Sequence, residues 1–115
     1  MTKLTTLSCV ACSGDSPLAT PEEIKTLRLQ VPEWNILISE GVGKLERVFE
    51  FSDFIQALEF TNNVGNLAEQ ENHHPAVLTE WGRVTVTWWT HKIRGLHQSD
   101  FIMAAKTEKY FLSSL

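Results

Sequence analysis

The sequence predicts an α+β fold, a four-stranded antiparallel sheet with three helices packed on one face in the order α-β-β-α-β-β-α. Two segments, 34–51 and 76–91, have strand-like patterns interrupted by a turn, and each therefore predicts a hairpin. Apolar residues at helical spacing occur before, between and after these hairpins. Interleaving of hairpins and helices is typical of a two-layer domain.

The chain is expected to form one domain over residues 20–115, preceded by a flexible leader over residues 1–19. The leader is rich in serine, threonine and other small residues and has no sustained period. It holds both cysteines, Cys9 and Cys12, in a lone CxxC pair. Without a second pair or a following βαβ pattern, this motif is a weak signal for a metal or redox site.

The first helix has a clear start. Thr20 can serve as its N-cap, Pro21 suits the first helical position, and Glu23 is placed to complete a capping box. Pro32 is expected to end the helix. Its apolar face would consist of Ile24, Leu27 and Val31.

The first hairpin is predicted as a strand over 34–38, a turn over 40–43 and a returning strand over 44–51. Helical spacing then begins at Ser52 and fades in the polar residues that precede His73. The expected inward residues are Leu45, Phe49 and Phe51 on the strand and Phe54, Ala57, Leu58, Thr61, Val64, Gly65 and Ala68 on the helix.

The second hairpin is predicted as strands over 76–79 and 83–91, joined by a turn at 80–82. Period-two alternation places His91 at the end of the second strand, on the face opposite Val84 and Val86. The last helix is expected to begin around residues 97–100, with His97 on the surface. Its inward residues would be Phe101, Ala104, Ala105 and Leu112.

Composition excludes several classes of function. The net charge is -4, and the basic residues form no run, so direct nucleic-acid binding is disfavoured. No apolar stretch approaches the roughly 20 residues that span a bilayer, and the N-terminus lacks the apolar region of a signal peptide. We therefore expect a cytoplasmic protein. The short chain favours self-association, and some of its four tryptophans are expected to lie in an interface or a ligand pocket.

Three histidines, His73, His74 and His91, lie at the edges of the second hairpin, and Pro75 restricts His74 to extended geometry. Imidazoles that converge on one cleft suit proton transfer near neutral pH. Each could instead be a polar loop residue with a purely structural role. With Glu69, they could also form a zinc or iron site.

The spacing around these histidines carries a family resemblance. Three residues separate Glu69 from the run His73-His74-Pro75, five follow before Trp81, nine more before His91, and eight more before Asp100. This pattern resembles the signature of the pterin-4a-carbinolamine dehydratases, and the likeness extends over roughly residues 20–113.

The resemblance implies dehydration of a 4a-hydroxytetrahydropterin to a quinonoid dihydropterin, in the recycling of the cofactor of aromatic amino acid hydroxylases. It implies a reaction that needs neither a metal nor an organic cofactor. It also implies that the protein assembles as a homodimer or homotetramer. His73, His74 and His91 would be catalytic, with His73 and His91 flanking the substrate and His74 orienting its ring or sharing the proton transfer.

The remaining signature residues, Glu69, Trp81 and Asp100, are assigned to substrate binding. Glu69 could fix the tautomer of an imidazole or meet the amino-pyrimidinone edge of the pterin, or it could be a solvated residue at a helix end. Asp100 could be a helix cap, and Trp81 could stack near the pterin or simply close the hairpin. A weakly active relative that serves as a protein-binding or assembly factor is the alternative function.

Overall fold

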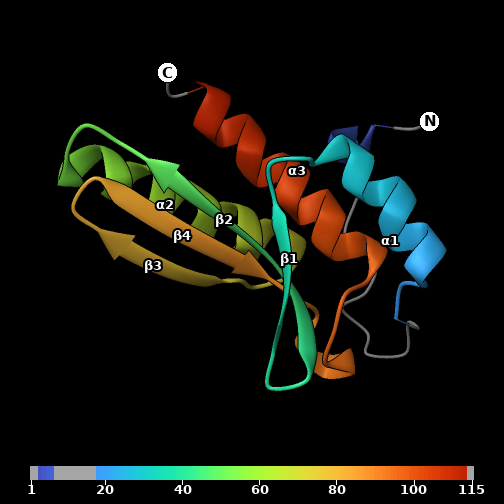
Figure 1. Cartoon of the computed structure of the whole chain (residues 1–115). Helices are drawn as coiled ribbons and strands as arrows, with labels where there is room; N and C mark the ends of the chain where they lie inside the picture. Colours follow the sequence, from blue (N-terminus) through green and yellow to red (C-terminus); the bar gives the residue numbers. More distant parts are fainter. Residues whose placement is uncertain (1–2, 7–17, 114–115) are drawn as a thin grey trace.

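A computed structural model of the chain describes residues 3–6 and 18–113, and its order of helices and strands confirms the predicted fold class. The strands form one antiparallel sheet in the order β1-β2-β4-β3. Figure 1 shows the path of the chain. The elements are β1 (Asn35–Ser39), β2 (Val42–Glu50), β3 (Ala76–Glu80), β4 (Arg83–Trp88), α1 (Pro21–Leu27), α2 (Phe54–Glu71) and α3 (Gln98–Ser113), with single 3-10 turns η1 (Leu4–Thr6), η3 (Arg28–Gln30) and η4 (His91–Ile93).

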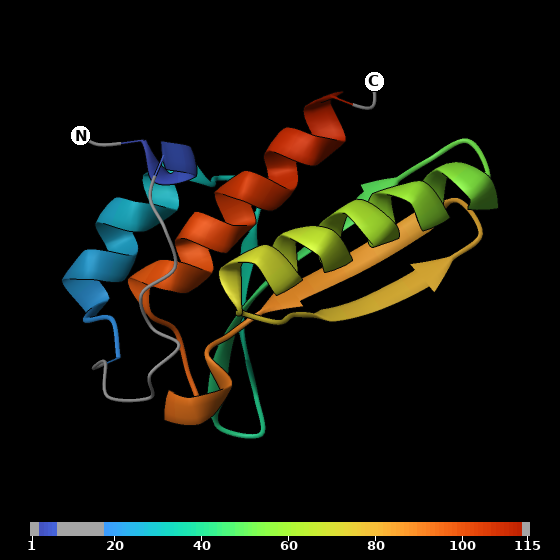
Figure 2. The same cartoon turned by 180° about the vertical axis from the view of Figure 1, so that it is seen from behind.

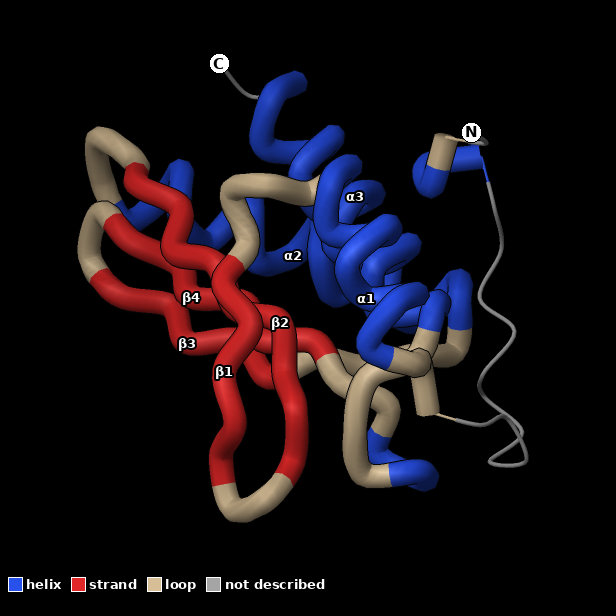
Figure 3. The backbone as a smooth tube through the Cα atoms, turned by 45° about the vertical axis from the view of Figure 1, so that its right-hand side comes forward, coloured by secondary structure: helices blue, strands red, loops and turns tan. Residues whose placement is uncertain are grey.

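The helices α2 and α3 cover one face of the sheet, and α1 lies beside α3 (Figures 2 and 3). In the central strand pair, Leu45 lies opposite Trp88 and Phe49 opposite Val84. All four side chains are buried, because alternate residues of a strand point to the same face. The core therefore lies between this face and the helical layer.

The helix α1 begins as predicted. The Thr20 hydroxyl accepts a hydrogen bond from the Glu23 amide (3.1 Å), and the Glu23 carboxylate accepts one from the Thr20 amide (2.9 Å). Hydrogen bonding of the Glu23 carboxyl to the Thr20 amide, and to a lesser degree to the Thr20 side chain, lowers the pKa of Glu23. The helix ends earlier than expected, at Leu27, and η3 continues the chain to the buried Val31.

Replacement of Thr20 by alanine is expected to lower the free energy of unfolding by about 1 kcal/mol, because an N-cap hydroxyl satisfies an otherwise unpaired helical amide. Urea denaturation measures this difference. Thr26→Ala, within the same helix but outside the cap, is the matched control. Equal destabilisation by both substitutions would contradict the capping role.

The buried face of α2 differs from the predicted one. Phe54 and Leu58, each 43% exposed, lie towards solvent, and Gly65 is also exposed. Phe60 and Leu67, which the spacing did not select, are buried instead. The residues that do face the core are Ala57, Phe60, Val64, Leu67 and Ala68.

The end of β4 also differs from the prediction. The strand stops at Trp88, so His91 is not a strand residue but begins η4. A bridge between Thr90 and Gly95 closes this turn, and Arg94 has a φ of 51° within it. In α3, Leu112 is exposed rather than inward, because it lies in the last turn of the helix.

Part of the predicted leader packs on the domain. Leu4, in η1, is only 2% exposed and belongs to the core, and its amide donates to the Gln30 side chain (3.1 Å). The packed structure therefore does not begin at residue 20. Cys9 and Cys12 lie outside the described residues.

Candidate functional site

His73 and Asp100 form a buried pair between the end of α2 and the start of α3. The His73 ring is 5% exposed, and its Nε2 lies 2.7 Å from Oδ1 of Asp100. The indole of Trp88 stacks on the imidazole at 5.6 Å with an interplanar angle of 8°. Because a carboxylate oxygen accepts, Nε2 of His73 donates this bond.

Asp100 is fully buried, and three donors converge on its carboxylate. Besides His73, the Thr90 hydroxyl donates to Oδ2 at 2.8 Å and the His97 amide donates to Oδ2 at 2.9 Å. The last bond confirms the capping role that the sequence suggested for Asp100. The half-buried His97 takes part in the same cap, since its Nδ1 accepts from the Ser99 amide at 3.1 Å.

His74 and His91 lie exposed beside this buried pair. Nε2 of His91 is 3.1 Å from the backbone carbonyl of His74, which brings the two residues to one place although 17 positions separate them. His74 in turn places its Nε2 against Oε2 of Glu69. Each partner atom is an acceptor, so each Nε2 carries a proton, and in a neutral ring the basic lone pair is then on Nδ1.

The surroundings of His91 also contain residues that the sequence signature did not select. The Trp89 ring stacks on His91 with centroids 4.3 Å apart, and Lys44 places its ammonium 4.2 Å from the centroid of the Trp89 ring. Thr90 was missed as well. Its position between Trp89 and His91 is the signal that could have found it.

Trp81 is not brought to the histidines within one chain. It lies in the β3–β4 turn, 74% exposed, next to the Glu80–Arg83 ion pair (2.9 and 3.1 Å) that lowers the pKa of Glu80. The histidines lie at the other end of this hairpin, where Ala76 pairs with Thr87. The length of β3, about 3.3 Å per residue, separates the two ends.

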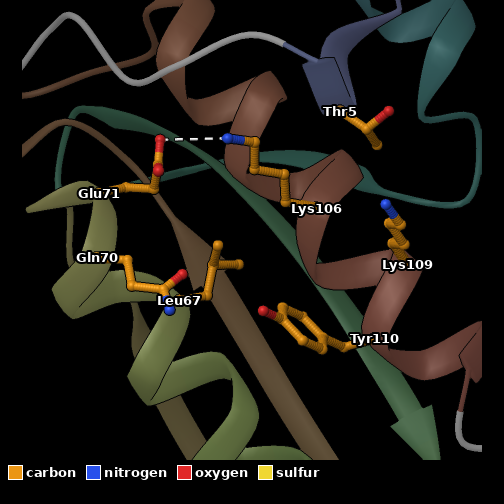
Figure 4. Close-up of a pocket in the computed structure, with 7 residues that line it drawn as sticks. All are labelled: Thr5, Leu67, Gln70, Glu71, Lys106, Lys109 and Tyr110. Carbon is orange, nitrogen blue, oxygen red and sulfur yellow. Dashed lines mark hydrogen bonds and ion pairs between the residues drawn. The ribbon is translucent and has the colours of Figure 1, made fainter.

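A hollow of about 340 Å³ lies on the helical side, lined by none of the three histidines (Figure 4). Within it, Lys106 on α3 pairs with Glu71 on α2 at 3.2 Å. Glu71 is two positions before His73, so this pair fixes the chain as it enters the site. The lining residues are Thr5, Leu67, Gln70, Glu71, Lys106, Lys109 and Tyr110.

Two further findings concern residues 3–6 and 18–113. In this part of the chain, no group of three or more His, Cys, Asp and Glu side chains is arranged to hold a metal ion. The candidate ligand His73 contacts Asp100, and the candidate ligands Glu69 and His74 contact each other. None of the described helices is long and apolar enough to cross a membrane.

The chain is thus a small α+β protein with a site of three histidines and a helix-capping aspartate, at the end of α2 and the start of β3. The model of the pterin 4 alpha carbinolamine dehydratase family matches residues 17–110. The chain belongs to this family.

Relatives and solved structures agree with this assignment. A protein of Marinobacter nauticus, provisionally named pterin-4-alpha-carbinolamine dehydratase, is 54% identical over 96% of this chain and 100% of its own length. A protein of Syntrophotalea carbinolica with the same name is 56% identical over 94% of this chain and 96% of its own length.

A Brucella melitensis structure, a transcriptional coactivator/pterin dehydratase, is 29% identical over 82% of this chain and 98% of its own, with a TM-score of 0.73. A pterin dehydratase-like RuBisCO assembly factor of the α-carboxysome has a TM-score of 0.58 at 18% identity over 68% of this chain and 88% of its own. The second likeness shows the fold alone.

Proposed function

We propose that this protein dehydrates a 4a-hydroxytetrahydropterin to the quinonoid dihydropterin and water, within the recycling of the cofactor of aromatic amino acid hydroxylases. Membership of the family and the names of the relatives support this reaction. The proposed setting is the cytoplasm.

The reaction needs two proton transfers. The bond between C4a and the hydroxyl oxygen breaks, and this oxygen takes up a proton and leaves as water. A base removes the proton on N5, whose electrons form the new double bond to C4a. Groups that give and take protons at one site, without any change of oxidation state, are therefore what the reaction requires.

We assign these transfers to His74 and His91. The observation that carries this assignment is the bond from Nε2 of His91 to the His74 backbone carbonyl, because it brings together two residues whose imidazoles are exposed. It leaves the lone pair of neutral His91 on Nδ1, which suits a base for N5–H. His74, whose Nε2 faces the Glu69 carboxylate, is the proposed acid for the departing hydroxyl.

Burial of His73 favours a change in the roles expected from the sequence. A ring that is 5% exposed and bonded to Asp100 is poorly placed to contact a ligand that arrives from solvent. We therefore propose that His73 and Asp100 are positioning residues, which fix the start of β3 and hence His74. Glu69 orients His74 in this proposal.

Replacement of His74 or His91 by alanine is expected to lower kcat/KM about 100-fold, the usual contribution of one general acid or base. Formation of the quinonoid pterin from freshly prepared carbinolamine measures the rate above the uncatalysed reaction. His97→Asn is the matched control, because asparagine also caps helices. If both alanine variants keep the rate of the His97→Asn variant, the assignment of the proton transfers to His74 and His91 fails. A wild-type rate equal to the uncatalysed rate would instead defeat the dehydratase proposal and favour the assembly-factor alternative.

Self-association to a homodimer or homotetramer is also proposed. Large apolar side chains remain exposed on α2 and on the β3–β4 hairpin, where they could be covered by another copy. They are Ile55, Leu58, Leu78 and Trp81. Light scattering on the full chain tests this, and a monomer at all concentrations would contradict it.

A further inference from the structure

We propose that Trp89 and Lys44 are positioning residues that hold the His91 imidazole in its working orientation. This inference rests on the proposed role of His91. Lys44, Trp89 and His91 form a cluster in which the ammonium lies 4.2 Å from the indole centroid and the imidazole centroid lies 4.3 Å from it.

The orientation of His91 needs such a support. His91 is exposed and lies in the single turn η4, so few neighbours restrict its ring. The hydrogen bond to the His74 carbonyl fixes the position of Nε2 but permits rotation of the ring about that bond. Stacking on Trp89, at an interplanar angle of 29°, restricts this rotation and so determines where Nδ1 points.

The sheet positions Trp89 itself. Leu45 lies opposite Trp88 in the β2–β4 ladder, so Lys44 and Trp89 come next along the two antiparallel chains. Trp88 points into the core, where its Nε1 donates to Thr107 at 3.0 Å. Trp89 therefore projects to the opposite side, and attraction between the Lys44 ammonium and the indole face holds it against β2.

The two contacts that His91 makes have different effects on its imidazole. One contact, to the His74 carbonyl, sets the tautomer, and the other, to Trp89, sets the plane of the ring. Loss of the second contact leaves the chemistry of the imidazole intact but misdirects it. The expected loss therefore falls on kcat, because small errors in the placement of reacting groups lower the rate of the chemical step.

The test compares Trp89→Ala with Trp89→Phe in the full chain. We expect Trp89→Ala to lower kcat about 10-fold with KM nearly unchanged, and Trp89→Phe to restore most of the rate, because a phenyl ring can still stack. Lys44→Ala should give a smaller loss of kcat, with Lys25→Ala on α1 as the matched control. A folded Trp89→Ala variant with the kcat of the wild type would overturn the proposal.

Nuclear magnetic resonance gives a readout that does not depend on activity. The ring-proton signals of His91, assigned by their loss in His91→Ala, should carry the upfield shift caused by the indole face. Trp89→Ala should remove this shift and leave the Nε2–H tautomer in place. Identical His91 ring-proton shifts in the wild type and in Trp89→Ala would show that the ring does not stack on Trp89 in solution, which also overturns the proposal.

A double variant separates this inference from the proposed function. If Trp89 acts through His91, then Trp89→Ala should cause no further loss of kcat in the His91→Ala background. Additive losses would contradict action through His91. If His91→Ala alone keeps the wild-type rate, the proposed role of His91 fails, whereas the ring-proton shift still reports whether Trp89 orients the imidazole.

Discussion

Replacement of Asp100 by alanine is expected to lower the free energy of unfolding by about 3 kcal/mol, since removal of one partner from a buried pair leaves the other without compensation. Three donors would lose their acceptor at once: Nε2 of His73, the Thr90 hydroxyl and the His97 amide. No water can replace the carboxylate without entering a fully buried position.

The same substitution is expected to lower kcat/KM, because release of His73 frees the start of β3 and with it His74. Urea denaturation measures stability, and the carbinolamine assay is run where the variant is folded. The matched control is Asp53→Ala, which removes the exposed N-cap carboxylate of α2. It should cost about 1 kcal/mol and leave the rate unchanged. Equal stability losses in the two variants would contradict the central role of Asp100.

Local sequence signals predicted the starts and the order of the elements well. The Thr20 cap, the turn at Gly41 and the alternation of Val84 and Val86 are each decided by residues within a few positions. The buried face of α2 was harder to predict from the sequence. Phe54 and Phe60 are both aromatic, and only the position of β2 and α3 determines that Phe60 contacts Phe49 and Phe111 while Phe54 faces solvent.

The candidate site was predictable as a set of residues but not as an arrangement. Spacing identified His73, His74 and His91, yet it could not show that Asp100, 27 positions away, holds His73 inside the protein. Nor could it show that His91 leaves the strand, because the Thr90–Gly95 bridge that ends β4 depends on residues further along the chain. Adjacent histidines therefore have opposite exposures for reasons that lie in the tertiary structure.

Replacement of Phe49 by alanine is expected to lower the free energy of unfolding by about 3 to 5 kcal/mol, as is usual when a buried phenylalanine is truncated. Phe49 is 1% exposed and contacts aromatic rings on α2, on α3 and in the loop before β1. Its ring centroid lies 5.8 Å from Trp34, 4.7 Å from Phe60 and 5.0 Å from Phe111. Truncation would also remove the ring face against which the Arg47 guanidinium packs.

The control for this prediction is Phe54→Ala, which removes the same ring from a position that is 43% exposed. Thermal unfolding should separate the two variants, because each kcal/mol shifts the Tm of a domain of this size by about 4–8 °C. Phe49 pairs with Val84, four pairs along the β2–β4 ladder from Leu45 and Trp88, and so lies away from the histidines. Well below its lowered Tm, the Phe49→Ala variant should therefore keep the wild-type kcat, whereas loss of kcat in the folded variant would show that the core and the site are coupled.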